Sequence, residues 1–143
     1  MIRLSETKNI LLTNPELWVN NGSFQNGASA GSSYDTVFNV NGTGARIVNN
    51  RLIKVPAETF QLHVNEGFQF TVVTFNDEKK YPGSGKGYIF PWQDAPAEDI
   101  TISNALEYIV IGLRKTGITL TTDNAVDAGV CLSYEYSGEG VAV

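Results

Sequence analysis

The sequence predicts an all-β fold, an antiparallel two-sheet β-sandwich or jelly roll, with a closed barrel as the alternative. The chain of 143 residues has 14 glycines, and Asn, Thr and Val are frequent. No window keeps a 3.6-residue apolar period over three turns, which argues against helices. Instead, short alternating segments recur about every 8 to 12 residues and number about eight to ten. One domain accounts for a chain of this length.

Four short strand candidates lie in the first half of the chain. They are residues 17–24, 35–40, 45–48 and 51–55. Asn-Gly, Gly-Thr-Gly and Asn-Asn sequences separate them, and turns favour these residue types. We assign residues 1–13 to an N-terminal extension, residues 14–136 to the folded module and residues 137–143 to a flexible, glycine-rich tail.

The clearest strand pair lies in the middle of the chain. Residues 60–64 alternate apolar and polar side chains, and residues 68–75 begin with the same period of two. The Asn-Glu-Gly sequence between them is a turn, because glycine readily takes a positive φ. The pattern predicts a β-hairpin with one buried face.

The second half of the chain contains three more strand candidates. Residues 107–114 are apolar on both faces, which is typical of a central strand covered from both sides. A turn leads from them into residues 118–121, and residues 130–136 alternate as a last strand. Residues 95–99 are the only weak helical candidate.

Charge and cysteine content exclude several classes of protein. Ten Lys and Arg against fifteen Asp and Glu give a net charge of -5, with no basic run. Nucleic acids and anionic membranes attract clustered positive charge, so we expect neither as a partner. A single cysteine, Cys131, excludes an intramolecular disulfide and zinc sites built from several cysteines. The first residues lack the apolar block of a signal peptide, so we expect the chain to fold in a cytoplasm.

The sequence predicts no enzyme and no cofactor. A nucleophile–histidine pair would have to use His63, the only histidine, which lies in an alternating strand without a catalytic motif nearby. We therefore interpret it as a half-exposed strand residue. Asp94, Glu98 and Asp99 are close in sequence but typical of a solvated acidic loop, and residues 83–87 lack the order of a phosphate-binding loop.

One loop leaves room for a structural calcium ion. Calcium takes six to eight oxygen ligands, of which backbone carbonyls supply several. Asp123, Asn124 and Asp127 are candidate donors in one loop, although the spacing of an EF-hand is absent.

Aromatic residues outside the alternating strands are the better functional candidates. Sugars are recognised by flat aromatic faces beside hydrogen-bonding side chains. The candidate stacking residues are Trp92, Tyr88, Tyr81 and Tyr34, and the candidate hydroxyl partners are Arg46, Gln93 and Asp94. Burial of Trp92 in the core is the competing interpretation, whereas the apolar neighbours of Trp18 predict a core position for that residue.

Several segments occur in an order that a known family shares. Leu17-Trp18-Val19-x-x-Gly22 precedes Asn26-Gly27, an arginine-containing strand, the strand RLIKVPA at 51–57, Phe-rich strands and LEYIVIGLRK at 106–115. In this order they resemble the jelly-roll carbohydrate-binding modules of tail and baseplate proteins in phages of Gram-positive bacteria. In those modules the strands W-x-x-G, I-x-V-x-P and Y-I-x-I-x-L-R-K follow one another in the same order. The resemblance covers roughly residues 14 to 136.

The resemblance implies a non-catalytic module that recognises host cell-wall polysaccharide during adsorption. It further implies a place in the tail or baseplate of the virion, with wall poly- or oligosaccharide and other virion tail proteins as partners. Two alternatives remain. The first is a structural virion module, a decoration or connector protein that binds other subunits and no sugar. The second is a glycoside hydrolase or lyase built on a β-sandwich.

Overall fold

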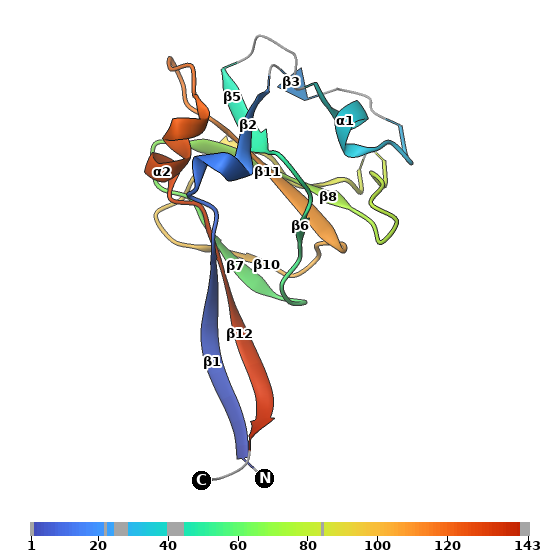
Figure 1. Cartoon of the computed structure of the whole chain (residues 1–143), viewed down its shortest axis with the longest axis vertical. Helices are drawn as coiled ribbons and strands as arrows, with labels where there is room; N and C mark the ends of the chain where they lie inside the picture. Colours follow the sequence, from blue (N-terminus) through green and yellow to red (C-terminus); the bar gives the residue numbers. More distant parts are fainter. Residues whose placement is uncertain (1, 22, 25–28, 40–44, 84, 141–143) are drawn as a thin grey trace.

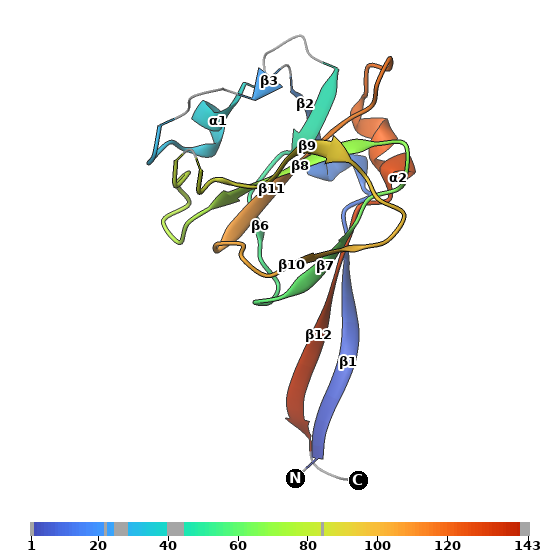
Figure 2. The same cartoon turned by 180° about the vertical axis from the view of Figure 1, so that it is seen from behind.

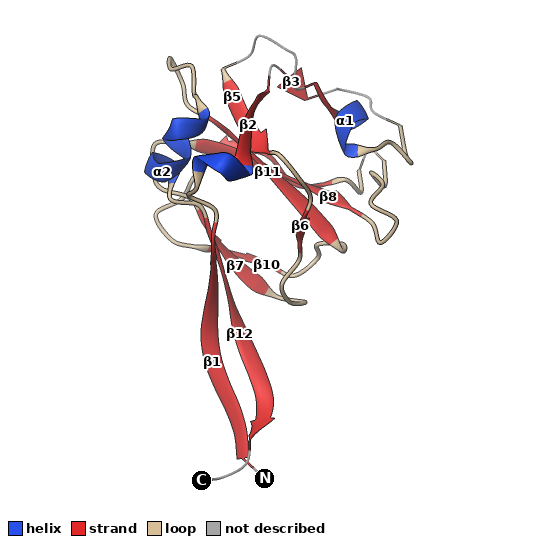
Figure 3. Cartoon of the chain, in the orientation of Figure 1, coloured by secondary structure: helices blue, strands red, loops and turns tan. Residues whose placement is uncertain are grey.

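The computed structural model describes residues 2–21, 23–24, 29–39, 45–83 and 85–140, with the backbone alone for 2–5, 21, 23–24, 39 and 137–140. Strands dominate it, and the helical segments are short (Figure 3). They are η1 (Pro15–Leu17), α1 (Tyr34–Val37), η2 (Thr122–Asn124) and α2 (Ala125–Ala128). No helix within the described ranges has the length and apolar composition to cross a bilayer.

The strands form two main antiparallel sheets, which confirms the predicted all-β sandwich. The four-stranded sheet has the order β1 (Ile2–Leu11), β12 (Cys131–Gly140), β7 (Phe60–His63), β10 (Ile100–Ile102). The six-stranded sheet has the order β2 (Trp18–Asn21), β5 (Arg46–Asn49), β11 (Tyr108–Arg114), β8 (Gln69–Phe75), β9 (Tyr88–Asp94), and β6 (Ile53–Lys54) also pairs with β11. A separate pair consists of β3 (Ser23–Phe24) and β4 (Phe38–Asn39).

The strand order is that of a jelly roll. The chain passes repeatedly from one sheet to the other, so that β1, β12, β7 and β10 face β5, β11, β8 and β9. Four strands of the six-stranded sheet thus face the four-stranded sheet, and crossing connections of this kind between two antiparallel layers are typical of the jelly-roll topology. The closed-barrel alternative is therefore wrong.

The predicted hairpin between residues 60–64 and 68–75 is also wrong. β7 pairs with β10 and β12, whereas β8 pairs with β11 and β9 in the other sheet. Residues 65–67 carry the chain across the sandwich rather than back along the same sheet. A hairpin and two facing strands give the same alternating sequence pattern. In the sandwich, the apolar residues of the two segments enter one core from opposite sheets.

The main core lies between the two sheets. Phe60 and Leu62 from β7 meet Phe70 and Val72 from β8 there, all almost fully buried. Trp18 is 3% exposed, and its indole Nε1–H donates a hydrogen bond of 2.7 Å to the carbonyl of Leu12. The predicted core position of Trp18 is thus confirmed.

A second apolar cluster covers half of the outer face of the six-stranded sheet. Val37 and Phe38, at the end of α1, pack there against strand residues and Tyr81. Val110 of β11 belongs to this cluster, whereas Ile109 and Ile111 belong to the main core. β11 is therefore the central, doubly covered strand that its sequence predicts.

Some predicted elements differ from the structure. Residues 35–40 enter the helical turn α1 and then the short strand β4, and Val40 lies outside the described residues. Residues 118–121 form only an isolated bridge, Lys115 with Ile118, and residues 95–99 are not helical. β9 and β10 were not predicted as strands, because Pro91 and the flanking Gly and Pro residues obscure the alternation of β9.

The two ends of the chain form a projecting ribbon. β1 and β12 pair in one antiparallel ladder from Ile2 with Gly140 to Leu11 with Cys131. The ribbon extends away from the sandwich, with both termini at its far end (Figures 1 and 2). Most of the supposed N-terminal extension is thus a strand of the fold, and residues 137–140 of the supposed flexible tail are the end of β12, while 141–143 lie outside the described residues.

Candidate functional site

The other half of the outer face of the six-stranded sheet carries polar and aromatic side chains. On β5, β8 and β11 the residues next to Arg46, Gln69 and Arg114 are buried in the main core. Because side chains alternate along a strand, these three project to the opposite face. We name this group, with two residues from β9, the Trp92 platform: Arg46, Gln69, Trp92, Asp94 and Arg114.

Strand register brings four of these residues into one row across the sheet. Arg114 pairs with Gln69, and Gln69 pairs with Asp94. One step beyond the last pair of β5 with β11, the antiparallel register places Arg46 opposite Arg114. Arg114 Nε donates to Gln69 Oε1 at 2.7 Å, and Gln69 Nε2 donates to Asp94 Oδ1 at 2.9 Å.

Trp92 connects this row to the sheet beneath it. The guanidinium carbons of Arg46 and Arg114 lie 5.0 and 4.5 Å from the centre of the Trp92 ring. The indole edge reaches across to Gly112 of β11, where an added Cβ would lie 3.2 Å from Trp92 Cη2. Glycine at this position therefore makes room for the ring.

The platform has more positive than negative charge. Among the residues that the structure describes, Arg46 has no hydrogen-bond or ion-pair partner, although its guanidinium stacks on Trp92. Burial and the charge of Arg46 lower the pKa of Arg114, and Asp94 acts in the opposite direction. Two arginines and one carboxylate thus meet on a protein whose net charge is -5.

Tyr88 lies at the border of the platform. It belongs to the same strand as Trp92 but packs half-buried against the second apolar cluster. Burial and the neighbouring Tyr81 raise its pKa, and the charge of Arg46 acts against them. Its hydroxyl thus lies close enough to Arg46 for the two charges to interact.

Three predicted site residues lie elsewhere. Tyr81 is 2% exposed, and its ring fills the space beside Gly87, so no ligand can stack on it. Gln93 pairs with the core residue Phe70 and so points to the opposite side of the sheet from Trp92. Tyr34 donates its hydroxyl hydrogen to the carbonyl of Asn49, and burial raises its pKa to about 12.

Sequence reasoning missed Gln69 and Arg114. The only signal in the sequence is Gly112 inside an otherwise apolar strand that ends in Arg114. The sequence does not show which side chain packs against this glycine, because Trp92 lies two strands away in the sheet.

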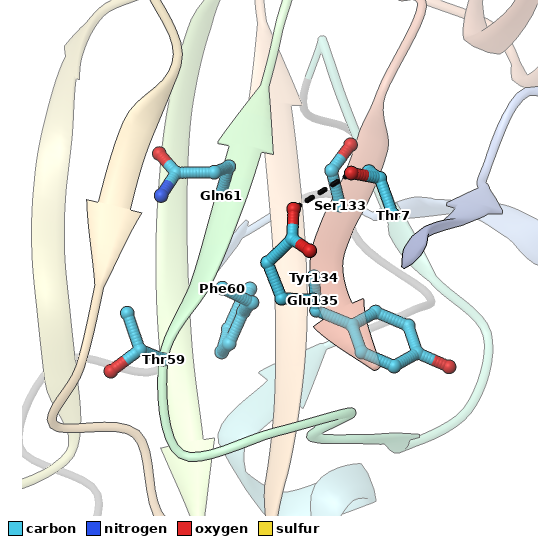
Figure 4. A pocket seen from close by; sticks show the side chains of 7 residues that line it. All are labelled: Thr7, Thr59, Phe60, Gln61, Ser133, Tyr134 and Glu135. Carbon is cyan, nitrogen blue, oxygen red and sulfur yellow. Dashed lines mark hydrogen bonds between the residues drawn. The ribbon is translucent and has the colours of Figure 1, made fainter. Parts of the chain in front are cut away.

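A second candidate site lies on the four-stranded sheet, where β12 diverges from β7. The cavity there has a volume of about 230 Å³. Thr7 Oγ1 donates a hydrogen bond of 2.7 Å to Glu135 Oε1 at its rim (Figure 4). The lining is mostly polar side chains with two aromatic residues: Thr7, Thr59, Phe60, Gln61, Ser133, Tyr134 and Glu135. It has hydrogen-bonding groups but no exposed cation.

His63 of β7 pairs with Cys131 of the adjacent strand β12, but the two side chains do not form a nucleophile–base pair. Nδ1 lies 2.8 Å from Asp99 Oδ1, and Nε2 lies 2.7 Å from Asn65 Oδ1. Both ring nitrogens are thus engaged with oxygen acceptors, and neither is directed to the thiol. The imidazole fastens β7 to two neighbouring loops.

The predicted calcium donors form no preorganised cage in the described part of the chain. Asp123 and Asp127 are exposed, and the amide of Asn124 lies 3.5 Å from Asp127 Oδ2. No group of three or more His, Cys, Asp and Glu side chains comes together among the described residues.

Comparisons of the chain with protein-family models, with curated proteins and with solved structures found no significant match.

Proposed function

We propose that this protein is a non-catalytic carbohydrate-binding module of a phage tail or baseplate, which binds host cell-wall polysaccharide through the Trp92 platform. The observation that carries the proposal is the row from Arg46 to Asp94 beside Trp92. It combines an aromatic ring with charged and amide groups held in fixed register. Sugar recognition needs this combination of an apolar face and directional hydrogen bonds.

The sheet makes the platform rigid. The residues of the row come from neighbouring strands, and hydrogen bonds join Arg114, Gln69 and Asp94 side by side. A preorganised surface loses little conformational entropy when a ligand binds. Weak binding by one copy is compatible with adsorption, because many copies on a virion multiply the affinity about a hundredfold or more.

The test uses fluorescently labelled protein with intact Gram-positive cells and their purified wall polysaccharide. Trp92→Ala is expected to weaken binding by about 1 to 3 kcal/mol, since it removes the ring and the support of both guanidinium groups. Tyr136→Ala is the matched control, because Tyr136 is an aromatic residue 52% exposed on the distant ribbon. Equal binding by both variants would contradict the proposal.

Stability separates binding from folding in this test. Trp92 is half-buried, so Trp92→Ala should lower the melting temperature less than Trp18→Ala, which empties a core position. A Trp92→Ala protein as unstable as Trp18→Ala would identify Trp92 as a core residue instead.

A structural virion module is the second candidate, and the ribbon is the observation that favours it. From Tyr134 to Gly140, β12 pairs only with β1, and no other described strand covers its second edge. An open edge of this kind accepts a strand from another chain. Sedimentation of the purified chain tests this candidate, and a stable oligomer without polysaccharide binding would favour it.

A further inference from the structure

We infer that the sugar recognised by the Trp92 platform is anionic, with its carboxylate or phosphate held by the guanidinium groups of Arg46 and Arg114. This inference rests on the proposed function, because it names the class of glycan that the same site takes.

The first argument is the placement of two like charges. Arg46 and Arg114 lie opposite each other on adjacent strands, and both approach the same indole ring, at 5.0 and 4.5 Å. Like charges in directly opposite positions of a sheet destabilise it. Asp94, the one carboxylate of the row, is joined to Arg114 only through Gln69. An anion between the two guanidinium groups would remove the repulsion.

The second argument is the supply of hydrogen-bond donors. Among the described residues, Arg114 uses Nε on Gln69, and Arg46 has no acceptor. A guanidinium group stacked on an aromatic ring keeps the N–H groups at its edge available. Two such groups match the oxygens of a carboxylate or a phosphate, which accept bidentate hydrogen bonds from arginine.

The third argument is the comparison with the other aromatic ring that two cations approach. Lys54 and Lys79 each lie 5.7 Å from the centre of the Tyr108 ring, but Lys54 also lies 3.9 Å from Glu107. The two arginines of the platform lie closer to their ring, and neither forms an ion pair with a carboxylate among the described residues.

The experiment measures binding of the full chain to one purified Gram-positive wall polysaccharide in four forms. These are untreated, mock-treated, freed of phosphate esters with cold hydrofluoric acid, and carboxyl-reduced with carbodiimide and borohydride. We expect one of the two treatments to weaken binding about tenfold or more, the size of losing a charge-assisted bidentate contact. Which treatment does so identifies the anion as phosphate or carboxylate.

Variants assign the effect to the platform. Arg46→Gln should weaken binding to the untreated polysaccharide about tenfold and remove the difference between treated and untreated forms. Arg46→Lys keeps the positive charge but loses the planar, bidentate donor geometry of the guanidinium group. Its affinity should therefore lie between those of the unchanged protein and Arg46→Gln. Arg51→Gln is the control, because Arg51 is exposed, does not belong to the platform and donates a hydrogen bond to its neighbour Asn50.

Two failures are distinguishable. Equal binding to all four forms, with loss in Trp92→Ala, would overturn the anionic specificity and leave the proposed function intact. No binding to any form, or equal binding by Trp92→Ala and Tyr136→Ala, would overturn the proposed function and this inference with it. Equal binding to an acidic peptide such as polyglutamate would also overturn the inference.

Discussion

Gly112 shows at the residue scale how the platform depends on one missing side chain. An added Cβ would lie 3.1 Å from Thr71 Cγ2 and 3.2 Å from Trp92 Cη2. Replacing glycine by alanine inside an unobstructed strand usually stabilises a protein. Here we expect Gly112→Ala to lower the free energy of unfolding by about 1 to 2 kcal/mol, through overpacking, and to weaken polysaccharide binding. Urea denaturation measures the first effect, and a more stable variant would contradict the packing described for Trp92.

His63 gives a pH dependence at the same scale. Asn65 Nδ2 donates to the carbonyl of Asp127, which directs Asn65 Oδ1 to the imidazole. Only the protonated ring can donate to both Asn65 and Asp99, and these hydrogen bonds raise the pKa of His63. The stabilisation is complete below the unfolded pKa of about 6.5 and is lost as pH rises through the higher folded value.

The test follows the single histidine signal by NMR as pH is varied. We expect its midpoint to lie above that of a model histidine and to fall in Asp99→Asn, which replaces the charged acceptor. The effect on stability is small, because the His63 side chain is 37% exposed. A midpoint at or below the ordinary value would contradict the double hydrogen bond.

At the scale of elements, the sequence predicts which segments are strands better than which strands pair. The alternation in residues 60–64 and 68–75 correctly identifies their buried faces, but not that they belong to different sheets. Pairing depends on long-range packing that a period of two does not encode. The same limit applies to the site: Trp92, Arg46 and Asp94 were predicted, whereas Arg114 and Gln69 join them only through register.

The β1–β12 ribbon carries the prediction at this scale. Among the described strands, β7 covers β12 only from Cys131 to Ser133, and none pairs beside the ribbon from Ser5 with Ser137 to Ile2 with Gly140. Two-stranded ribbons are marginally stable in water. We therefore expect amide hydrogen exchange to be slow near Cys131 and fast near Gly140. Uniformly slow exchange would instead indicate that a second chain covers the ribbon.

At the scale of the whole molecule, the jelly roll separates its two candidate binding regions. The Trp92 platform lies on the outer face of the six-stranded sheet, and the ribbon extends from the four-stranded sheet. The proposed function requires a surface for a receptor and an attachment to the virion, and the platform and the ribbon are the places that we propose for them. Composition and alternation predict the sandwich, but only the folded chain shows that polar residues and Trp92 from four strands meet on half of the outer face of the six-stranded sheet.

The central claim, a glycan site at Trp92, is tested most directly by the two indole Nε1–H signals in an NMR titration with fragments of wall polysaccharide. Trp18 is an internal control, because its Nε1–H is buried and bonded to the carbonyl of Leu12. We predict that the Trp92 signal shifts progressively with added fragments while the Trp18 signal stays in place. An unchanged Trp92 signal at saturating binding would contradict the account.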